Sequence, residues 1–419
     1  MDASGKKEVI SVIGLGIVGL TTAVGFALKG HKVIGIDIDP AKVKQINEKK
    51  CPIYEVGLAD ALQKVNIEAT TDHHAALESD ISFLCGGTPP KADGSIDLYY
   101  LEVPARQLGE VFRNKDGDHT IVVRSTVIPG TVEKVILPLF KDFPNVGICM
   151  NPEFLREGTA IEDFLKPSRI VLGINNKKTG NIMQNLYKEF DSPVLKTNFK
   201  TAEMIKEASN AFLATRISFI NEIGNTCREL GIDIYDVAQG MGYDERIGHN
   251  YLRAGVGFGG FCLPKDLSAL ISQAKELGYN PRLLEAVQQT NIDQPGRMIS
   301  LLKKHFPSLK GKTIGVLGLS FKPGTDDVRK SKALEVIDRL VTEGAQVKAY
   351  DPHAMKSFQK VFYNHVEYSS PEHVLDSDAV LIMTEWDEFN ELDYRDKVVI
   401  DGRRIMKAKE AKIYEGICW

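Results

Sequence analysis

The chain has 419 residues, of which 43% are apolar and 26% charged, so an ordinary globular protein of two or three domains is expected. Its 52 basic and 56 acidic residues leave a net charge of −4 without any basic block, which gives no indication of a nucleic-acid partner. The six cysteines are scattered, with no CxxC pair and no metal-like Cys/His spacing. We therefore expect free thiols in a reducing compartment and no bound metal.

A glycine-rich turn near the N-terminus predicts a dinucleotide site. Gly14, Gly16 and Gly19 lie between a predicted strand and a predicted helix, and a second predicted strand ends at Asp37, 18 residues after Gly19. In this motif the first glycine allows the turn, the second lets a pyrophosphate approach the backbone, and the third lets the helix pack on the strand. The aspartate accepts hydrogen bonds from a ribose 2′-OH and repels a 2′-phosphate. The pattern therefore predicts NAD rather than NADP.

The first apolar run has an alternative interpretation. Residues 9–28 contain no charged residue and follow Lys6 and Lys7, a pattern that a secretory signal or a membrane span also shows. The glycines within the run and its continuation into a second strand argue against both. No other stretch approaches the apolar length of a membrane span. We expect a soluble, cytoplasmic protein that has no membrane partner.

Strands and helices alternate through the first half of the chain, as in a doubly wound parallel sheet. Strands are expected at residues 9–13, 32–36, 81–85, 120–124 and 147–150. A helical pattern then covers residues 201 to about 230, which exceeds the usual helix length and suggests a central helix that forms a dimer. A further helical region is expected at 267–302.

The opening pattern returns in altered form near residue 313. A predicted strand at 313–317 leads into a turn at Gly318, a helix is expected at 331–343, and a second strand ends at Asp351. This copy lacks the full glycine motif, so it is free to bind a different ligand, such as a nucleotide sugar. The predicted α/β fold has two Rossmann-like doubly wound domains joined by a central helical region. The expected domains are 1–200 for NAD, 201–305 for dimerisation and the catalytic loop, and 306–419 for the nucleotide sugar.

Residues 255–266 combine glycines with a cysteine and two charged residues. Cys262 follows the glycines, and Lys265 and Asp266 come three and four residues later. A nearby cation favours the thiolate, which is the nucleophilic form of cysteine. The alternative for this segment is a structural glycine turn with an inert buried thiol.

Taken together, these motifs resemble the UDP-glucose/GDP-mannose dehydrogenase family over essentially the whole chain. The residues that carry the resemblance are 52–55, 87–89, 125–127, 151–158, 203–210, 246–248, 255–266, 321–322, Arg329, 384–386 and 401–404. Members of this family are oxidoreductases that convert the C6 alcohol of a nucleotide sugar to a carboxylate. The resemblance therefore implies NAD as cofactor, a nucleotide-sugar substrate with UDP-glucose as the nearest match, a homodimer and a role in polysaccharide biosynthesis.

The family's chemistry implies a role for each matching residue. Oxidation of an alcohol to an acid removes four electrons, so two NAD molecules each accept a hydride. Cys262 would hold the intermediate aldehyde as a thiohemiacetal and then as a thioester, which water hydrolyses. Lys206 would stabilise the oxyanion, although it could also be a solvated helix lysine. Asn210, four residues later on the same helix face, is implied to be catalytic as well. Further catalytic roles, in positioning water or in acid–base chemistry, are implied for Asp266, Glu153, Glu157 and Thr126.

The resemblance also implies two sets of contacts. Those to the cofactor are Gly14, Gly16, Ile17, Val18, Gly19, Asp37, Lys42, Thr88, Thr126, Glu157, Lys265 and Arg329. Those to the substrate are Phe154, Leu155, Lys206, Asn210, Arg246, Tyr251, Arg253, Gly259, Phe321, Lys322 and one or both of Arg403 and Arg404. Arg246 would reach the sugar bound by the partner of a dimer, and its alternative is a surface arginine.

Two positions depart from the family pattern. Val56 replaces a usual proline, which concerns the stiffness of a loop, and Phe261 stands where a serine usually precedes the cysteine, which leaves the sugar open. The same chemistry on GDP-mannose, UDP-N-acetylmannosamine or UDP-N-acetylglucosamine is therefore an alternative. A two-electron hydroxyacid dehydrogenase is a more distant one, and it gives no reason for the cysteine loop. A non-catalytic nucleotide sensor would be expected to lack some of the catalytic residues.

Overall fold

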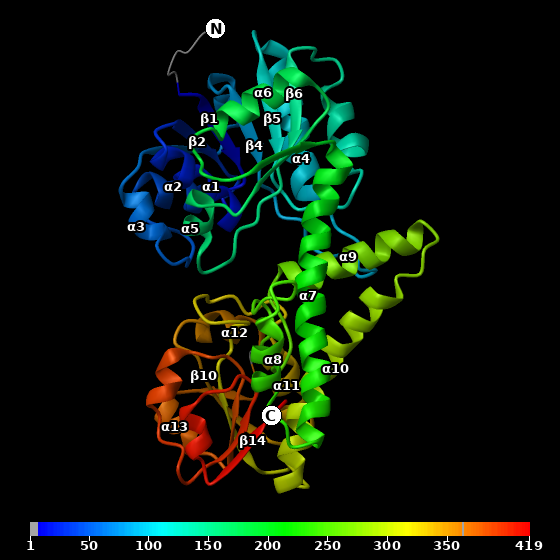
Figure 1. Ribbon diagram of the computed structural model, residues 1–419. Coiled ribbons are helices and arrows are strands. Elements are labelled where there is room, and N and C mark those ends of the chain that lie inside the picture. The colour runs from blue at the N-terminus through cyan, green and yellow to red at the C-terminus, as the bar shows by residue number, and fades with distance from the viewer. Residues whose placement is uncertain (1–6, 363) are drawn as a thin grey trace. The chain divides into compact units, whose positions relative to one another are not determined.

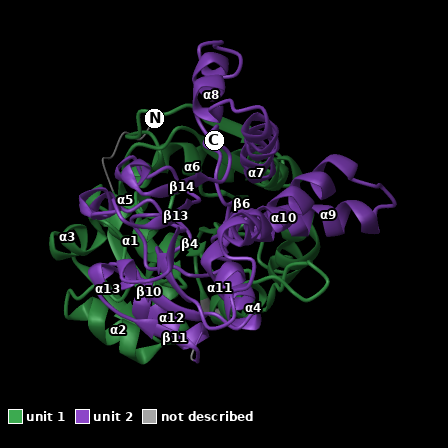
Figure 2. Ribbon diagram, turned by 90° about the horizontal axis from the view of Figure 1, so that it is seen from below, with its two compact units in different colours: residues 1–209 green, residues 210–419 purple. Residues whose placement is uncertain are grey.

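The computed structural model describes residues 7–362 and 364–419. The chain forms two compact units, Met1–Ser209 and Asn210–Trp419, which Figure 2 colours green and purple. Helix α7, Phe199–Glu229, is continuous through the boundary between them. Each unit contains one sheet.

The first unit contains an eight-stranded sheet in the order β3-β2-β1-β4-β5-β6-β7-β8. All neighbouring strands are parallel except β6 and β7, which are antiparallel. The strands are β1 Val9–Ile13, β2 Lys32–Ile36, β3 Ile67–Thr70, β4 Ile81–Leu84, β5 His119–Val123, β6 Val146–Met150, β7 Ile170–Ile174 and β8 Val194–Thr197.

Helices cover the sheet of the first unit (Figure 1). They are α1 Ile17–Leu28, α2 Pro40–Asn47, α3 Leu58–Gln63, α4 Tyr99–Val111, α5 Ala160–Leu165 and α6 Lys177–Leu186. Every residue of β4 and of β5 is buried. Buried parallel strands have near-continuous apolar sequences because both faces of the sheet are covered. Two apolar clusters result, one that includes Val12 and Phe83 and one that includes Ile13 and Ile121.

The second unit contains a six-stranded, fully parallel sheet in the order β11-β10-β9-β12-β13-β14. Its strands are β9 Thr313–Leu317, β10 Gln346–Tyr350, β11 Val366–Tyr368, β12 Ala379–Ile382, β13 Val398–Asp401 and β14 Ile413–Gly416. Its helices after α7 are α8 Ile234–Gly242, α9 Cys262–Glu276, α10 Arg282–His305, α11 Lys332–Thr342, α12 Met355–Val361 and α13 Pro371–Leu375.

The two sheets repeat one topology, which confirms the predicted fold of two Rossmann-like domains. In each sheet the first strand lies between the second and the fourth of its unit, so the strand order reverses beside it. In open α/β sheets ligands bind outside the carboxyl ends of the strands at this reversal. The turn after the first strand has a glycine with a positive φ in both units, Gly14 at 89° and Gly318 at 93°.

Two features differ from the sequence-based expectation. Strands β3, β7 and β8 extend the first sheet beyond the predicted strands. The helical region expected at 267–302 is two helices, α9 and α10, separated by residues 277–281, and α9 begins five residues early, at Cys262. Within residues 7–362 and 364–419, no helix combines the length and the apolar character needed to cross a membrane.

Candidate functional site

The glycine turn of the first unit fits a dinucleotide pyrophosphate. The Gly14 amide donates to the Ile36 carbonyl at 2.8 Å, which continues the pairing of β1 with β2 into the turn between β1 and α1. A Cβ on Gly19 would lie 1.7 Å from the Gly14 carbonyl oxygen, so only glycine allows this helix to pack on the strand. A Cβ on Gly16 would meet nothing within 4 Å, which leaves open space beside the backbone at the start of α1. The free N–H groups of a helix N-terminus favour a phosphate in that space.

Asp37 lies directly after β2 and its carboxylate is largely buried. One oxygen, Oδ2, accepts from the Leu15 amide at 2.7 Å and pairs with Lys42 Nζ at 2.9 Å. The other, Oδ1, accepts from the Asp39 amide at 3.0 Å. The carboxylate is thus fixed at the end of the strand next to the glycine turn, where the sequence pattern places the ribose.

The ends of β4 and β5 are tied together by hydroxyl groups. Thr88 Oγ1 donates to the Thr126 carbonyl at 2.9 Å, and Ser125 Oγ donates to the Gly86 carbonyl at 2.7 Å. The structure therefore brings together two of the predicted cofactor residues, Thr88 and Thr126, at the carboxyl edge of adjacent strands.

Lys206 is buried, with only 3% of its surface exposed, so it is not a solvated helix lysine. Its Nζ lies 2.9 Å from Glu153 Oε1, and Glu153 is buried too. The second carboxylate oxygen of Glu153 accepts from the Leu155 amide at 2.5 Å. Two cations lie over the ring of Phe154. Lys206 Nζ is 5.5 Å and Arg169 Cζ is 3.6 Å from the centroid of the ring. Four sequence-predicted residues, Glu153, Phe154, Leu155 and Lys206, therefore meet in the first unit.

Glu157 lies on a loop that a buried carboxylate holds in place. Both oxygens of Glu55 accept backbone N–H groups from this loop, from Gly158 at 2.9 Å and from Ala160 at 2.8 Å. Glu157 itself is half-buried. Glu55 belonged to a motif that the sequence singled out, but its bonding to this loop could not be found from spacing because 103 residues separate Glu55 from Gly158.

In the second unit, Cys262 is exposed and is the first residue of α9. A buried charged pair follows within about one turn of α9. Lys265 Nζ lies 2.5 Å from Asp266 Oδ1, and Asn210 Nδ2 donates to Asp266 Oδ2 at 2.6 Å. A helix N-terminus favours a negative charge, so this position suits a thiolate. The structure thus brings three of the predicted catalytic residues into α9 and the adjoining part of α7.

The other cysteines lie in less reactive surroundings. Cys85, Cys149, Cys227 and Cys418 are buried. Burial raises the pKa of the Cys85 and Cys418 thiols to about 12, and it also raises the pKa of Cys149. The pKa of Cys51 is raised for the same reason. Cys262 is the exposed thiol among the six.

Phe261, the residue that departs from the family pattern, contacts two cations. Its ring centroid lies 4.4 Å from Arg329 Cζ and 5.5 Å from Lys265 Nζ. Both cations were predicted to contact the cofactor. Arg329 also forms a bidentate pair with Asp327, with contacts of 2.7 to 2.9 Å. The aromatic ring beside Cys262 therefore helps to place charged side chains, which a serine at this position could not do.

Amide side chains fix the glycine loop before Cys262. Asn221 Oδ1 accepts from the Gly255 amide at 2.8 Å, and Gln294 Nε2 donates to the Gly255 carbonyl at 2.9 Å. Asn291 makes two bonds to the backbone of Phe258, at 2.7 and 3.0 Å. Sequence reasoning missed these three amides, and their only signal is that polar residues occupy buried helix positions.

The loop also packs closely on the region after β9. A Cβ on Gly259 would lie 2.3 Å from the Lys330 carbonyl oxygen and one on Gly260 would lie 2.8 Å from the Phe321 ring, so both positions require glycine. Lys332, which the sequence reasoning also missed, is buried next to Gly257 and pairs with Glu335 at 2.7 Å. Desolvation lowers the pKa of Lys332. The predicted substrate residues Gly259 and Phe321 therefore lie side by side.

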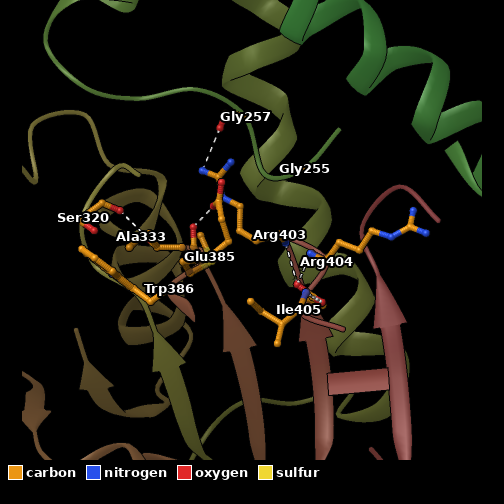
Figure 3. A network of polar contacts seen from close by, with 12 residues as sticks. Gly255, Gly257, Ser320, Ala333, Glu385, Trp386, Arg403, Arg404 and Ile405 are labelled. Carbon is orange, nitrogen blue, oxygen red and sulfur yellow. Dashed lines mark hydrogen bonds and ion pairs between the residues drawn. The ribbon is translucent and has the colours of Figure 1, made fainter. Parts of the chain in front are cut away.

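The two consecutive arginines after β13 differ in direction (Figure 3). Arg403 extends to the glycine loop, where its Nη2 donates to the Gly257 carbonyl at 3.2 Å, and its Nε lies 3.4 Å from Glu385 Oε2. Arg404 turns away and pairs with Asp233 at 2.6 Å. Arg403 is therefore the better placed of the two for a ligand at this loop.

Three other predicted substrate residues lie on the surface of the second unit. Arg246, Tyr251 and Arg253 are all exposed. The Arg246 side chain is 88% exposed and pairs with Asp244 at 2.6 Å. Among the described residues, no group of three or more His, Cys, Asp or Glu side chains could hold a metal ion.

Comparison with known proteins identifies three matching regions. Residues 8–191 match the NAD binding domain of the UDP-glucose/GDP-mannose dehydrogenase family, residues 200–293 its central domain and residues 315–408 its UDP binding domain. A UDP-glucose 6-dehydrogenase of Haloferax volcanii is 43% identical over 97% of this chain and 99% of its own length. A GDP-mannose 6-dehydrogenase of Pseudomonas aeruginosa is 37% identical over 98% of this chain and all of its own.

A solved structure agrees with these matches. The UDP-glucose dehydrogenase of the archaeon Pyrobaculum islandicum superimposes with a TM-score of 0.97 and 42% identity, covering 100% of this chain and 99% of its own. The resemblance predicted from the motifs is therefore confirmed over the whole length. The chain belongs to the UDP-glucose/GDP-mannose dehydrogenase family.

Proposed function

We propose that the protein is a UDP-glucose 6-dehydrogenase, which oxidises the C6 alcohol of UDP-glucose to the carboxylate of UDP-glucuronate. The observation that carries the proposal is the exposed Cys262 at the start of α9, followed by the buried Lys265–Asp266–Asn210 cluster. The family membership and the UDP-glucose dehydrogenases among the relatives support this choice of substrate.

NAD, when bound, accepts one hydride in each of the two oxidation steps. The turn at Gly14, Gly16 and Gly19 would hold its pyrophosphate, since the backbone beside Gly16 is open. Asp37 and Lys42 would contact its ribose, and Thr88 and Thr126 would line its nicotinamide side. Glu157, Lys265 and Arg329 complete the proposed cofactor contacts.

The first oxidation removes a hydride from C6 and a proton from its hydroxyl, which gives the aldehyde. A water held near Glu153 and Thr126 would take the proton, with Glu153 as the base. The Cys262 thiolate then adds to the aldehyde carbon, forming a C–S bond. Lys206 and Asn210 would stabilise the resulting oxyanion of the thiohemiacetal. The covalent bond retains a reactive intermediate that would otherwise escape or hydrate.

The second hydride leaves the thiohemiacetal carbon and produces a thioester. Water positioned by Asp266 attacks the thioester carbon, the C–S bond breaks, and Cys262 leaves as the thiolate while the sugar becomes a carboxylate. The diphosphate requires cations, and Arg403 and Lys322 would supply them. Phe154, Leu155, Gly259, Phe321, Tyr251 and Arg253 complete the proposed substrate contacts.

The stoichiometry of NADH tests the proposal. Incubation with NAD and UDP-glucose should yield two NADH for each sugar consumed, measured by absorbance against the uronate formed. GDP-mannose, UDP-N-acetylmannosamine and UDP-N-acetylglucosamine in parallel test the alternative sugars, because one relative is a GDP-mannose 6-dehydrogenase. One NADH with accumulating aldehyde would contradict the four-electron mechanism, and turnover of simple hydroxyacids alone would favour a two-electron dehydrogenase.

We further propose that the protein is a homodimer formed through the central helices. Phe212 and Phe219 are exposed apolar residues seven positions apart on α7, and therefore on one face of the helix, while Leu283 and Ile292 are exposed on α10. Arg246 would then extend to the sugar of the partner. A monomer in sedimentation equilibrium at micromolar concentration would contradict this proposal.

We place the enzyme in the cytoplasm, where its six free cysteines stay reduced. We also assign its product to polysaccharide biosynthesis. Reduced thiols in protein isolated without a reductant, and labelled uronate in cell polysaccharide, are the expected findings. Secreted, disulfide-linked protein would contradict the location.

A further inference from the structure

Glu203 is a fully buried acid in the first unit that the proposed mechanism does not use. Its Oε2 accepts from the Gly130 amide at 2.5 Å and its Oε1 accepts from the Val132 amide at 2.8 Å. Burial of a carboxylate is costly unless hydrogen bonds compensate it. Here both partners belong to one segment, residues 125–132, which we call the Thr126 loop. Gly130 has a φ of 96°, so the turn that presents its amide favours glycine.

The Thr126 loop is bonded at both of its ends. At the start, the Thr126 carbonyl accepts from Thr88 Oγ1 at 2.9 Å. At the other end, Glu203 attaches the loop to α7. Lys206 lies three residues after Glu203 on the same helix and bonds to Glu153 at 2.9 Å. A continuous series of contacts within one unit thus joins a predicted cofactor residue to a predicted catalytic pair.

We propose that Glu203 is a positioning residue that holds the Thr126 loop against α7 and thereby sets the affinity of the N-terminal domain for the nicotinamide dinucleotide. This inference rests on the proposed function for the role of Thr126 and Thr88. In this proposal Glu203 acts indirectly, since its two oxygens accept from backbone amides.

The protonation state of Glu203 decides how many of these bonds form. A carboxylate accepts from both amides, whereas a protonated carboxyl accepts at one oxygen and presents a donor to the other amide. Burial raises the pKa of Glu203 to about 7. The hydrogen bonds from the Val132 and Gly130 amides lower the pKa, but their effect is smaller than that of burial. Glu133 on the following segment raises the pKa further, and Lys200 on α7 lowers it. Those two side chains pair with each other at 2.6 Å, and Lys134 also lies beside Gly130.

Loop attachment and fold stability therefore change with pH in opposite directions. The loop is fully attached above about pH 7, where the carboxylate predominates. The folded-state pKa is raised above the ordinary glutamate value of 4.5, so the contribution of this group to stability is complete below pH 4.5 and is lost as the pH rises through about 7. A purely structural acid would change stability alone. A positioning acid also changes the affinity for the dinucleotide.

The experiment titrates NADH fluorescence with the full-length protein at pH 6 and pH 8. For the wild type, binding at pH 8 should be about fivefold tighter than at pH 6, as expected for one recovered hydrogen bond. Glu203→Gln should bind about fivefold more weakly than wild type at pH 8 and lose the pH dependence. Glu189→Gln, which removes an exposed acid paired with Lys7 in the same unit, should match the wild type at both pH values. Equal affinities of wild type and Glu203→Gln at both pH values would overturn the assignment.

Hydrogen exchange of the wild-type protein serves as a test that does not depend on folding of the variant. Protection of the Gly130 and Val132 amides, corrected for intrinsic exchange, should be greater at pH 8 than at pH 6, and unchanged protection would overturn the proposal. NADH binding requires no sugar oxidation, so the proposed function can fail separately. The expected pH-dependent binding in a protein that oxidises no nucleotide sugar would support the role of Glu203 and contradict the proposed function.

Discussion

Replacement of Cys262 with serine is expected to lower steady-state formation of the carboxylate by at least about a thousandfold. Serine keeps the size of the side chain and its place at the start of α9, but its hydroxyl is un-ionised at neutral pH and is a far poorer nucleophile. The first hydride can still leave the alcohol, because that step does not involve the thiol. We therefore expect no more than one NADH for each sugar converted, because the second hydride has to leave a sulfur adduct that the serine variant does not form.

Rapid-mixing absorbance gives the NADH burst, and mass spectrometry of the wild type quenched in acid should detect a sugar bound to the peptide that contains residue 262. Cys51→Ser is the matched control, because Cys51 is a half-buried thiol in the other unit whose pKa is raised. It should leave turnover unchanged. Two NADH per sugar at the wild-type rate from Cys262→Ser would discard the thioester.

Lys206→Ala is expected to reduce both stability and catalysis. Removal of the ammonium leaves the Glu153 carboxylate buried with an uncompensated charge, which should lower the free energy of unfolding by about 3–5 kcal/mol. The same change removes the group proposed to stabilise the oxyanion, so kcat should fall by about a hundredfold or more. Denaturant unfolding and initial rates at saturating substrate measure the two effects.

Two further variants separate these effects. Lys178→Ala removes a lysine paired with Asp118 at 2.5 Å on the exposed surface of the same unit, and should change stability by less than about 1 kcal/mol. The double variant Lys206→Met with Glu153→Gln removes both buried charges, so it should recover stability relative to Lys206→Ala while remaining inactive. An active double variant would contradict the catalytic role of the pair. A stability loss for Lys206→Ala no larger than that for Lys178→Ala would contradict the buried ion pair.

The local sequence pattern is sufficient to predict the bounds of a strand when these depend only on the residues of the strand and its flanks. Strands β1 and β2 have the predicted bounds, because an apolar run between a charged segment and a glycine turn leaves little freedom. The same reasoning found β9 and the second copy of the turn. The helices α9 and α10 were merged, although Gly278 and Pro281 mark the break between them, with a φ of 79° at Gly278. Because the apolar periodicity continues through both helices, the pattern predicts one helical region and does not indicate the turn between them.

Contacts between distant residues could not be predicted in this way. The burial of Lys206 depends on Glu153, 53 residues away, and its neighbours in α7 gave no clear apolar face. Likewise, Glu203 meets an amide 73 residues away, which no spacing rule encodes. The role of Lys206 came from the family resemblance, whereas that of Glu203 is inferred from the structure. The structure shows which groups these side chains contact within the unit.

The aspartates that end β2 and β10 occupy equivalent places in the two sheets but differ in what they bond. Asp351 Oδ2 accepts from the amides of Leu319 and Ser320 at 2.8 and 3.0 Å, and from Ser320 Oγ and Trp386 Nε1, each at 3.0 Å. The other oxygen, Oδ1, accepts from the His353 and Ala354 amides at 2.9 and 2.8 Å. Because both oxygens are bonded within the unit and the carboxylate is wholly enclosed, it is not available to a ribose.

We therefore expect the dinucleotide to bind at the N-terminal turn, whereas the proposed reaction releases two hydrides. The NADH formed in the first oxidation therefore has to dissociate, and a second NAD has to bind, before the second oxidation can take place. The half-oxidised sugar must remain bound during this exchange, so it has to dissociate from the protein more slowly than NADH does.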